Sequence, residues 1–472
     1  MKTSHFLAID LGATSGRTML ATFDGNCVGL KEYTRFANPM IRMGGHLFWD
    51  LPALYNEIIK ALKQVAAEGL ELTSIGIDSW GCDFAFFGKD GQLMRLPYCY
   101  RDSHTDGAMD RYFKKFDKRE LYDRTGIQFM NFNSVFQLDT IRRSDFPFWD
   151  DIDTIYFIPD ALTYMLTGKS VCEYTVASTS QILNAAEKDL DETILKSLKL
   201  KRKRFGKMVQ PGTVVGHLSE EIRDLTGLGK VKVVAVAGHD TASAVAAVPA
   251  LSSNFAYLSC GTWSLMGIES PYPIINDESY AQNFTNEGGV EGTVRFLKNI
   301  GGLWMLEECR KEFRNSPSNI VELSALCEQS ECQAIINPDD PAFLHPGSMM
   351  TAIAVNCKQN GLPIPESDAD FVRVIFRSLA ARYAQILGIL EKFAPFNIER
   401  LNVIGGGSQN KYLMQYTADA IGRPVVCGPA EGTSLGNVLL QLKAAGYVNS
   451  LEEMRKITSA SVNPVIYTPK NQ

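Results

Sequence analysis

Short apolar runs rich in β-branched and aromatic residues recur along the chain and end in polar or glycine-containing turns. Runs of this length between turn residues predict buried strands. Longer segments with apolar residues at helical spacing predict helices, such as one from about 49 to 68 and another over 369–393. This mixture predicts an α/β fold. We expect strands at residues 6–9, 18–23, 28–36, 72–78, 84–88, 154–158, 231–237, 255–259, 263–267 and 401–404.

One device, two apolar strands joined by a small polar tip, appears twice. The first spans 6–23, with the tip Asp10-Leu11-Gly12-Ala13-Thr14-Ser15-Gly16-Arg17, and the second spans 255–268, with Gly261-Thr262 at its tip. A lone hairpin of this kind is often only structural. Two matching tips indicate duplicated lobes, residues 1–248 and 249–472, which each contribute a hairpin to a shared cleft.

The first tip has the chemistry of a phosphate site. Glycines let the backbone approach an anion closely, Thr14 and Ser15 add hydroxyl donors, and Arg17 adds a fixed positive charge. Asp10 can hold a hydrated Mg²⁺ against phosphates. GxGxxG and GxxxxGK[ST] motifs are absent from this segment, so a Rossmann or Walker site is not predicted there.

Gly238-His239-Asp240 follows the strand predicted at 231–237 and precedes an alanine-rich helix. A side chain at such a junction can face a crevice at the carboxyl end of a sheet. Asp240 is therefore a candidate catalytic carboxylate. The alternative is that it only caps the helix, since Asp is a preferred N-cap residue.

Trp80, Gly81 and Asp83 follow the strand at 72–78. An aromatic ring and a carboxylate so close together suit a polyol, because the ring packs on the carbon face and the carboxylate accepts hydroxyl donors. The alternative is a buried tryptophan at a strand end.

Later segments add weaker signals. Residues 285–289 predict a turn, and 298–302 predict the start of a helix that runs to about 313 and whose amino end can face the cleft. Residues 316–368 are proline-rich and predict an irregular surface excursion. Gly405, Gly406 and Gly407 leave a turn without side chains, on which a flat ring such as adenine can lie.

Composition narrows the class of protein. Lys and Arg total 47 against 53 Asp and Glu, a formal net charge of −6, so neither nucleic acid nor an anionic membrane is an expected partner. Ten cysteines without a CxxC pair predict reduced thiols rather than a zinc site. Neither an apolar signal core nor an apolar run of membrane-spanning length is found. We expect a soluble cytoplasmic protein.

Taken together, these motifs resemble the FGGY family of carbohydrate kinases, within the actin, Hsp70 and sugar kinase superfamily. Residues 10–17 look like its first phosphate loop, 260–263 like its second and 405–408 like its adenosine motif. The resemblance covers nearly the whole chain. It implies a two-lobed, ribonuclease H-like α/β fold that binds ATP and sugar in the interdomain cleft, with Mg²⁺, as a monomer or weak oligomer.

Within the family, several strings are most similar to kinases that act on the ketose L-rhamnulose. They lie at residues 78–84, 100–103, 126–129, 238–245, 257–267 and 285–289. The resemblance implies that Asp240 is the proton acceptor. It implies sugar contacts from Gly81, His239, Asp240, Thr241 and Asn299, beside Trp80 and Asp83, and ATP contacts from Ala13, Thr14, Ser15, Gly16, Arg17, Thr262, Gly405 and Gly406.

Position 307 departs from that pattern, because it is Glu where these kinases can carry a Gln that contacts nucleotide. We keep Glu307 as a candidate ATP contact. Two alternatives to an L-rhamnulose kinase remain. The first is a kinase for another ketose, such as L-fuculose or D-xylulose, which shares every ATP motif. The second is a nucleotide-binding and sugar-binding sensor without catalysis.

Overall fold

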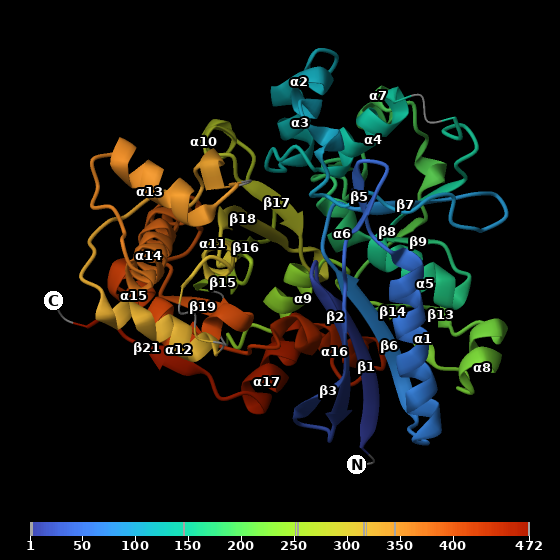
Figure 1. Cartoon of the computed structure of the whole chain (residues 1–472). Helices are drawn as coiled ribbons and strands as arrows, with labels where there is room; N and C mark the ends of the chain where they lie inside the picture. The colour runs from blue at the N-terminus through green and yellow to red at the C-terminus, as the bar shows by residue number, and fades with distance from the viewer. Residues whose placement is uncertain are drawn as a thin grey trace. The chain divides into compact units, whose positions relative to one another are not determined.

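The computed structural model of the chain describes residues 3–144, 147–250, 252, 254–314, 317, 319–343 and 346–470. The chain divides into two compact units (Figure 1). The first unit contains residues 1–247, 269–296 and 433–461, and the second contains 248–268, 297–432 and 462–472. Within the described residues, no helix combines the length and apolar character needed to cross a membrane.

A six-stranded sheet organises the first unit, in the order β13-β14-β6-β1-β2-β3. β1 pairs antiparallel with β2 and parallel with β6, and β6 pairs parallel with β14. The predicted strands at 6–9, 18–23, 28–36, 72–78 and 231–237 all lie in this sheet. Its strands are β1 (Ser4–Leu11), β2 (Ser15–Phe23), β3 (Val28–Ala37), β6 (Leu72–Ser79), β13 (Thr213–His217) and β14 (Lys232–Ala235).

The second large sheet repeats this topology. Its order is β17-β18-β16-β15-β19-β20-β21. β15 pairs antiparallel with β16 and parallel with β19, as β1 does with β2 and β6. β19 in turn pairs parallel with β20, as β6 does with β14. The duplicated hairpins predicted from the sequence therefore belong to two copies of one strand order. The strands are β15 (Phe255–Cys260), β16 (Trp263–Ser270), β17 (Thr285–Gly288), β18 (Val294–Gly301), β19 (Arg400–Ile404), β20 (Val425–Cys427) and β21 (Val465–Tyr467).

Four two-stranded sheets complete the strand inventory of the described residues, and all lie in the first unit. The strands predicted at 84–88 and 154–158 form one of them, with antiparallel pairing between Phe84 and Phe157. The pairs are β4 (Ile41–Met43) with β5 (His46–Phe48), β7 (Phe84–Phe87) with β8 (Thr154–Phe157), β9 (Val171–Glu173) with β12 (Lys207–Val209), and β10 (Leu183–Asn184) with β11 (Asp189–Leu190).

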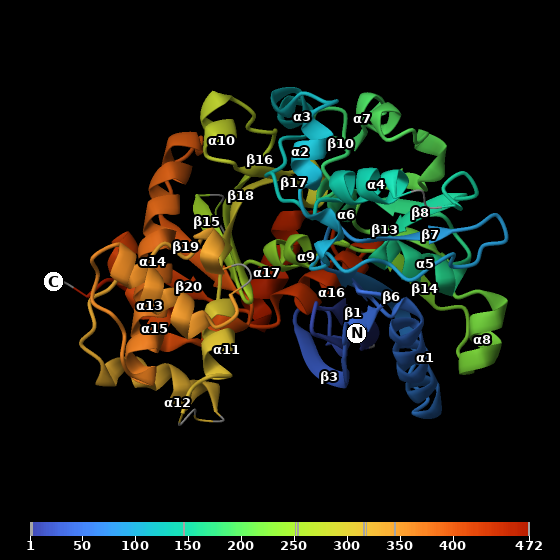
Figure 2. The same ribbon diagram turned by 45° about the horizontal axis from the view of Figure 1, so that its top comes forward.

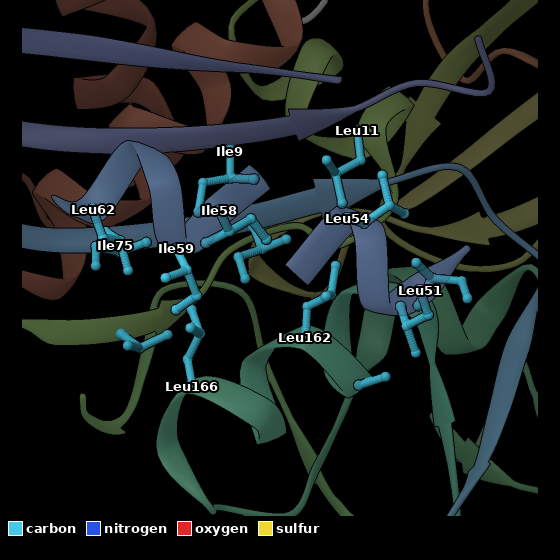
Figure 3. Packing of buried hydrophobic residues seen from close by; sticks show 14 of the residues in the cluster. Ile9, Leu11, Leu51, Leu54, Ile58, Ile59, Leu62, Ile75, Leu162 and Leu166 are labelled. Carbon is cyan, nitrogen blue, oxygen red and sulfur yellow. The ribbon is translucent and has the colours of Figure 1, made fainter. Parts of the chain in front are cut away.

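The helix predicted near 49–68 is α1, and it packs on the first sheet. Asp50 caps it by accepting a hydrogen bond from the Ala53 N–H, and Pro52 stands in its first turn, where a missing N–H costs nothing. Figure 3 shows side chains of α1 (Leu51–Ala67) gathered with Ile9 and Leu11 of β1 and with residues of β6 and α5 (Ile158–Thr167). Burial of this apolar stripe stabilises the layer behind the strand ends that carry the candidate site.

Eleven further helices belong wholly or almost wholly to the first unit, as far as the described residues show. They are α2 (Ala108–Phe113), α3 (Lys118–Thr125), α4 (Ser134–Arg143), α5 (Ile158–Thr167), α6 (Tyr174–Ser178), α7 (Glu192–Ser197), α8 (Glu220–Thr226), α9 (Asp240–Ala246), α10 (Asp277–Ala281), α16 (Gly432–Ala444) and α17 (Leu451–Ser461), after α1 (Leu51–Ala67).

In the second unit the long helix predicted at 369–393 is α14, capped at Ser367 by a capping box with Asp370. α15 packs beside α14, as both views show (Figures 1 and 2). The helices of this unit are α11 (Trp304–Arg310), α12 (Ile320–Ala325), α13 (Met349–Gln359), α14 (Asp368–Phe393) and α15 (Lys411–Ile421).

Three local predictions differ from the structure. Residues 285–288 are strand β17 rather than a turn, and 294–301 are strand β18, so the helix expected from 298 begins only at Trp304. Glycine pairs end both segments and give turn signals, and the polar sequence Thr-Asn-Glu-Gly of β17 contains no apolar run that would predict a strand. The excursion at 316–368 contains α12 and α13; residues 316, 318, 344 and 345 of it lie outside the described part of the chain.

The domain division also differs from the single boundary expected after residue 248. The first break falls one residue earlier, after Ala247, but residues 269–296 and 433–461 return to the first unit. Helix α16 is held by buried polar contacts, because Ser74 Oγ donates to Gln441 Oε1 at 2.7 Å and Asn437 Nδ2 donates to Asp78 Oδ2 at 2.6 Å. Contacts between residues more than 350 positions apart leave no local signal in a sequence.

Candidate active site

The junction between β14 and α9 places Asp240 beside the end of β6. The Ser79 N–H donates to the Gly238 carbonyl at 2.9 Å, and Ser79 forms an isolated parallel bridge with His239. Adjacent parallel strands of the first unit, β6 and β14, are therefore followed by the two predicted segments, Trp80-Gly81 and His239-Asp240-Thr241. The structure brings together the catalytic candidate and part of the predicted sugar-binding set, although about 160 residues separate them in the sequence.

Asp240 is the first residue of α9, and His239 occupies the N-cap position, without a capping hydrogen bond from its side chain. Oδ1 of Asp240 accepts hydrogen bonds from the Thr241 N–H at 2.5 Å and from Thr241 Oγ1 at 3.1 Å. The His239 Nε2 atom lies 3.4 Å from the same oxygen. All these contacts use Oδ1, and the side chain is 33% exposed, so Oδ2 is the oxygen suited to accept a proton.

Burial raises the pKa of the Asp240 carboxyl above its ordinary value. The negative charge of Asp10 adds to this rise, whereas His239 and the Thr241 hydrogen bonds counteract it. A carboxylate with a raised pKa is a better proton acceptor near neutral pH than an ordinary aspartate. The direction of this pKa shift is the one that a general base needs.

The first predicted phosphate loop is the turn between β1 and β2. Its tip is closed by a hydrogen bond from the Gly12 N–H to the Ser15 carbonyl at 2.9 Å. Asn38, which the sequence reading missed, holds the tip, because its N–H donates to the Thr14 carbonyl at 3.0 Å and its Nδ2 to the Gly12 carbonyl at 2.9 Å. Thr14 is exposed at the tip, and Ala13 and Ser15 are partly buried.

Gly16 fits this turn because it has no side chain. A Cβ atom there would lie 2.3 Å from the Phe36 ring. The glycine therefore allows β3 to pack against the base of the loop, which is a structural use as well as the nucleotide use expected for it.

Arg17 and Asp10 form an ion pair across the β1 to β2 pairing. Arg17 Nη2 donates to Asp10 Oδ2 at 2.8 Å and Nε donates to it at 3.0 Å, and Ser434 Oγ donates to the same oxygen at 3.1 Å. The predicted phosphate contact and the predicted metal ligand are thus bound to each other. If a phosphate and a cation bound here together, the phosphate would give Arg17 a new anionic partner and the cation would pair with Asp10.

A second carboxyl group, Asp78, stands next to Asp10 in the parallel register of β1 and β6. Burial raises its pKa well above the ordinary value, and the charge of Asp10 raises it further. Its Oδ1 atom is buried and has no hydrogen-bond partner among the described residues. Mg²⁺ is commonly held by one or two carboxylates together with substrate phosphates, so the donors at this point fit that ion.

Within the described residues, no group of three or more His, Cys, Asp or Glu side chains is arranged to hold a metal by itself. A dedicated structural metal site is therefore not seen there.

Asp83 has a structural environment that differs from the sugar contact expected for it. The residue is completely buried, and Oδ2 accepts hydrogen bonds from Trp49 Nε1 at 2.6 Å, from Trp80 Nε1 at 3.0 Å and from the Tyr100 N–H at 3.1 Å. Oδ1 accepts from Gln137 Nε2 at 2.8 Å. With four donors from the protein and no exposed surface, the geometry favours fixing of the two indoles rather than binding of a sugar hydroxyl.

Trp80 itself is 6% exposed, and its ring lies 4.3 Å from that of Trp49. Most of the Trp80 side chain is therefore buried at the end of a strand, as the structural alternative expected. What remains available is the chain just after it, where Gly81 is partly buried.

Gly81 packs directly on Thr179. A Cβ atom at Gly81 would lie 2.8 Å from Thr179 Oγ1, and that hydroxyl also accepts a hydrogen bond from the Cys82 N–H at 2.9 Å. Cys82 has a φ of 68°, a conformation that non-glycine residues rarely adopt. This strained turn over Thr179 sets the direction of the Gly81 backbone.

His239 has two charged neighbours that the sequence reading did not assign. Glu287 Oε2 lies 3.2 Å from His239 Nδ1, and Arg295 Nη2 lies 3.0 Å from it. Glu287 comes from β17 and Arg295 from β18, the segments whose secondary structure differed from expectation. The string 285–289 was noticed as a resemblance, but only the tertiary structure connects it with His239.

In the second unit, Thr262 is exposed at the tip of the β15 to β16 hairpin. The Leu303 N–H donates to the Gly261 carbonyl at 3.0 Å and the Trp304 N–H to the Thr262 carbonyl at 3.1 Å, so the start of α11 rests on this tip. Glu307 lies one turn later on α11, half exposed and 3.8 Å from Arg310. Asn299 lies on β18, partly buried.

The glycine run also belongs to this arrangement. Gly405 has a φ of 84°, and a Cβ atom there would lie 3.0 Å from the Cys260 carbonyl oxygen. A Cβ atom at Gly407 would lie 2.3 Å from Cys260 Sγ, whereas one at Gly406 would meet nothing within 4 Å. The structure therefore places the glycine turn against the end of β15, next to the second hairpin tip, and leaves Gly406 open.

The chain is similar to known proteins over nearly its whole length. The profile of the FGGY family of carbohydrate kinases matches in two parts, its N-terminal domain over residues 5–247 and its C-terminal domain over 256–445. A rhamnulokinase from Bacteroides thetaiotaomicron is 51% identical over 469 residues, which cover 99% of this chain and 96% of that protein.

Solved structures with a similar fold have low sequence identity to the chain. Gluconate kinase from Lactobacillus acidophilus matches with a TM-score of 0.83 at 15% identity, over 99% of this chain and 94% of that one. Glycerol kinase from Plasmodium falciparum, solved with ADP, matches with a TM-score of 0.79 at 16% identity over the same shares. The fold is that of two-domain sugar kinases, and the chain belongs to the FGGY family of carbohydrate kinases.

Proposed function

We propose that this protein transfers the terminal phosphoryl group of ATP to the primary hydroxyl of L-rhamnulose, which yields L-rhamnulose 1-phosphate in L-rhamnose catabolism. The observation that carries the proposal is the position of Asp240, at the junction between β14 and α9 and beside the Trp80-Gly81 segment. The full-length similarity to a rhamnulokinase supports the choice of ketose.

Asp240 accepts the hydroxyl proton in this proposal. Thr241 holds Oδ1 through two hydrogen bonds, which orients the carboxylate and leaves Oδ2 for the sugar hydroxyl. Phosphoryl transfer depends mainly on positioning and charge neutralisation, so the base supplies a limited part of the acceleration.

The remaining side chains position the two substrates. Gly81, His239, Thr241 and Asn299 contact the ketose, and the largely buried Trp80 supports the Gly81 segment from behind. The nucleotide is held by the first phosphate loop, by Thr262 and by the glycine turn, with Glu307 nearby; the loop residues are Ala13, Thr14, Ser15, Gly16 and Arg17, and the turn residues are Gly405 and Gly406.

Mg²⁺ would be held at Asp10, where it neutralises phosphate charge when bound. Asp10 and the neighbouring Asp78 supply oxygen donors of the type that this ion prefers. Asp83 enters the proposal only through the indoles that it fixes. We expect the enzyme to act in the cytoplasm as a monomer or weak oligomer.

A panel of ketoses tests the proposal. L-Rhamnulose, L-fuculose, D-xylulose and a buffer blank are each supplied with ATP and Mg²⁺, and ADP release is measured by a coupled assay. We expect the largest kcat/KM with L-rhamnulose, because a site built to hydrogen-bond a given set of hydroxyls discriminates against sugars that leave those groups unpaired.

The panel also separates the alternatives. A higher kcat/KM with L-fuculose or D-xylulose would identify another ketose kinase. ATP and sugar binding without any sugar-dependent ADP release would identify a sensor and contradict the proposed reaction.

A further inference from the structure

A buried pair of opposite charges stands behind His239, on the side away from Asp240. Glu287 Oε2 and Arg295 Nη2 are 3.0 Å apart, and both atoms lie close to His239 Nδ1. The side chain of Arg295 is 1% exposed and that of Glu287 is 7% exposed. Burial of an ion pair costs desolvation energy. We therefore asked what this pair does for the neighbouring residue His239.

Both members of this pair keep their charge. Arginine is not deprotonated in proteins. Burial alone would raise the pKa of Glu287, but that pKa is held below its ordinary value, and the charge of Arg295 is the largest of the effects that lower it. Arg295 is also fixed in place, since its Nε donates to the Gly288 carbonyl at 3.0 Å and the Gly288 N–H donates to Ser178 Oγ at 2.7 Å.

The two partners demand opposite states of the histidine. A guanidinium only donates, so a hydrogen bond from Arg295 needs an unprotonated Nδ1; a carboxylate only accepts, so one to Glu287 needs a protonated Nδ1. The hydrogen-bond geometry is satisfied for Arg295 with Nδ1, whereas Glu287 Oε2 has no partner among the described residues that meets it. The neutral imidazole then carries its proton on Nε2.

Nε2 is the nitrogen that faces the proposed reaction. It lies 3.4 Å from Asp240 Oδ1, while the His239 backbone N–H is held by Thr175 Oγ1 at 3.2 Å and the Gly238 N–H by Glu173 Oε2 at 2.9 Å. The charged or titratable side chains around His239 are thus Glu287 and Arg295 on one side, Asp240 on the other and Glu173 behind its backbone.

We propose that Arg295, neutralised by Glu287, is a positioning residue that holds His239 as the neutral tautomer with its proton on Nε2. His239 thereby presents a hydrogen-bond donor toward Asp240 and the substrate hydroxyl, and it does not compete with Asp240 as a base. No proton leaves the cluster in this scheme. Arg295 acts through His239 and does not itself touch substrate.

Nitrogen-15 NMR of histidine-labelled protein tests the tautomer directly, without substrate. The chain has only six histidines, and His239→Asn identifies the signal of interest by its disappearance. We expect an unprotonated Nδ1 and a protonated Nε2 near neutral pH. A wild-type spectrum with the proton on Nδ1, or on both nitrogens, would overturn the inference.

Arg295→Met and Arg295→Lys form the matched pair. Methionine keeps the bulk but removes the donor, so Glu287 is expected to draw the proton to Nδ1, and kcat should fall about tenfold or more with little change in the KM for ATP. Lysine keeps a positively charged donor and should restore the Nε2 proton and part of kcat. If both variants lose kcat equally with an unchanged wild-type tautomer, Arg295 has only a structural role.

The kinetic arm rests on the proposed function, whereas the NMR arm does not. An Nε2 proton in an enzyme that phosphorylates none of the tested ketoses would sustain the inference and reject the function. If Arg295→Met does not fold, the wild-type spectrum together with that of Glu287→Gln decides. We expect Glu287→Gln to keep the Nε2 proton, because Arg295 still donates to Nδ1, and a move of the proton to Nδ1 in that variant would contradict this assignment.

Discussion

Asp83 and Asp240 are carboxylates of one unit with opposite surroundings. Asp83 is fully buried among four donors, while Asp240 is one-third exposed and has protein donors on one oxygen only. An oxygen without a fixed donor can receive a proton from substrate, whereas one that is fully satisfied can only hold its neighbours in place. The sequence presented both as site candidates, and their donors separate the roles.

We expect Asp240→Asn to lower kcat by about 10²–10⁴-fold, the usual contribution of a positioned base. The amide is close in shape to the carboxylate, so ATP affinity and unfolding temperature should change little. Steady-state kinetics with ATP and L-rhamnulose measure the effect. Asp224→Asn, on the exposed surface of α8, is the control. Near-native turnover in Asp240→Asn would reject this residue as the base.

Asp83 should make stability depend on pH. Burial raises its pKa to about 6, although hydrogen bonds from Gln137, Trp49 and Trp80 counteract the rise. The folded state therefore binds this proton more tightly than the unfolded state, so its contribution to stability is complete below the unfolded pKa near 4 and is lost as the pH rises through 6.

The pH dependence of the stability difference between wild type and Asp83→Asn follows from this loss of stability with rising pH. We expect the wild-type advantage to shrink by about 3 kcal/mol between pH 4 and pH 7, because two pKa units correspond to that free energy. In the variant, the NH₂ group of the Asn side chain would face N–H donors that Asp83 accepts from. The variant should therefore be less stable at all these pH values. Urea unfolding of both proteins at several pH values measures this, and a constant difference would contradict the raised pKa.

Among elements, the contact between α11 and the second hairpin depends on one glycine. A Cβ atom at Gly302 would lie 2.6 Å from the Thr262 carbonyl oxygen and 2.6 Å from the Trp263 carbonyl carbon. Both are backbone atoms that cannot rotate away. Gly302 therefore lets the start of α11 rest on the tip that carries Thr262.

Gly302→Ala should displace α11 from that tip and weaken ATP binding by about tenfold, since overpacking of this kind typically costs 1–3 kcal/mol. Isothermal titration with ATP and Mg²⁺ measures the change. The control is Gly388→Ala on α14, where an added Cβ meets nothing within 4 Å and a helix former replaces glycine. Unchanged ATP affinity in Gly302→Ala would argue against a nucleotide site at this hairpin.

For the whole molecule, the return of residues 433–461 means that the first unit is not a continuous piece of sequence. Helix α16 contributes five buried apolar residues to it, Leu435, Val438, Leu439, Leu440 and Leu442. It approaches α9 so closely that a Cβ atom at Gly436 would lie 1.7 Å from the Ser243 carbonyl oxygen. The helix that begins with Asp240 is therefore packed against a helix from the far end of the chain.

A chain that ends at Gly432 should consequently lose the fold of its first unit. Removal of a buried leucine typically costs about 2–5 kcal/mol, so loss of these four leucines and the valine is comparable to or larger than the total stability of about 5–15 kcal/mol of an ordinary domain. Limited proteolysis and thermal circular dichroism measure the outcome. A chain that ends at Ser461 lacks only residues of the second unit and is the control. A protease-resistant, cooperatively melting fragment of residues 1–247 in the shorter chain would contradict this prediction.

The sequence by itself determined what depends on neighbours along the chain. Apolar periodicity located α1, α14, most strands of the first sheet and three strands of the second, β15, β16 and β19. The repeated hairpin indicated the duplicated strand order. These signals are local. The motifs were enough to indicate the family. Tertiary structure decided what depends on partners remote in sequence: the donors that enclose Asp83, the Glu287 and Arg295 pair behind His239, and the return of α16 to the first unit. Burial and hydrogen bonding are properties of the surroundings of a residue, and those surroundings exist only after the chain has folded.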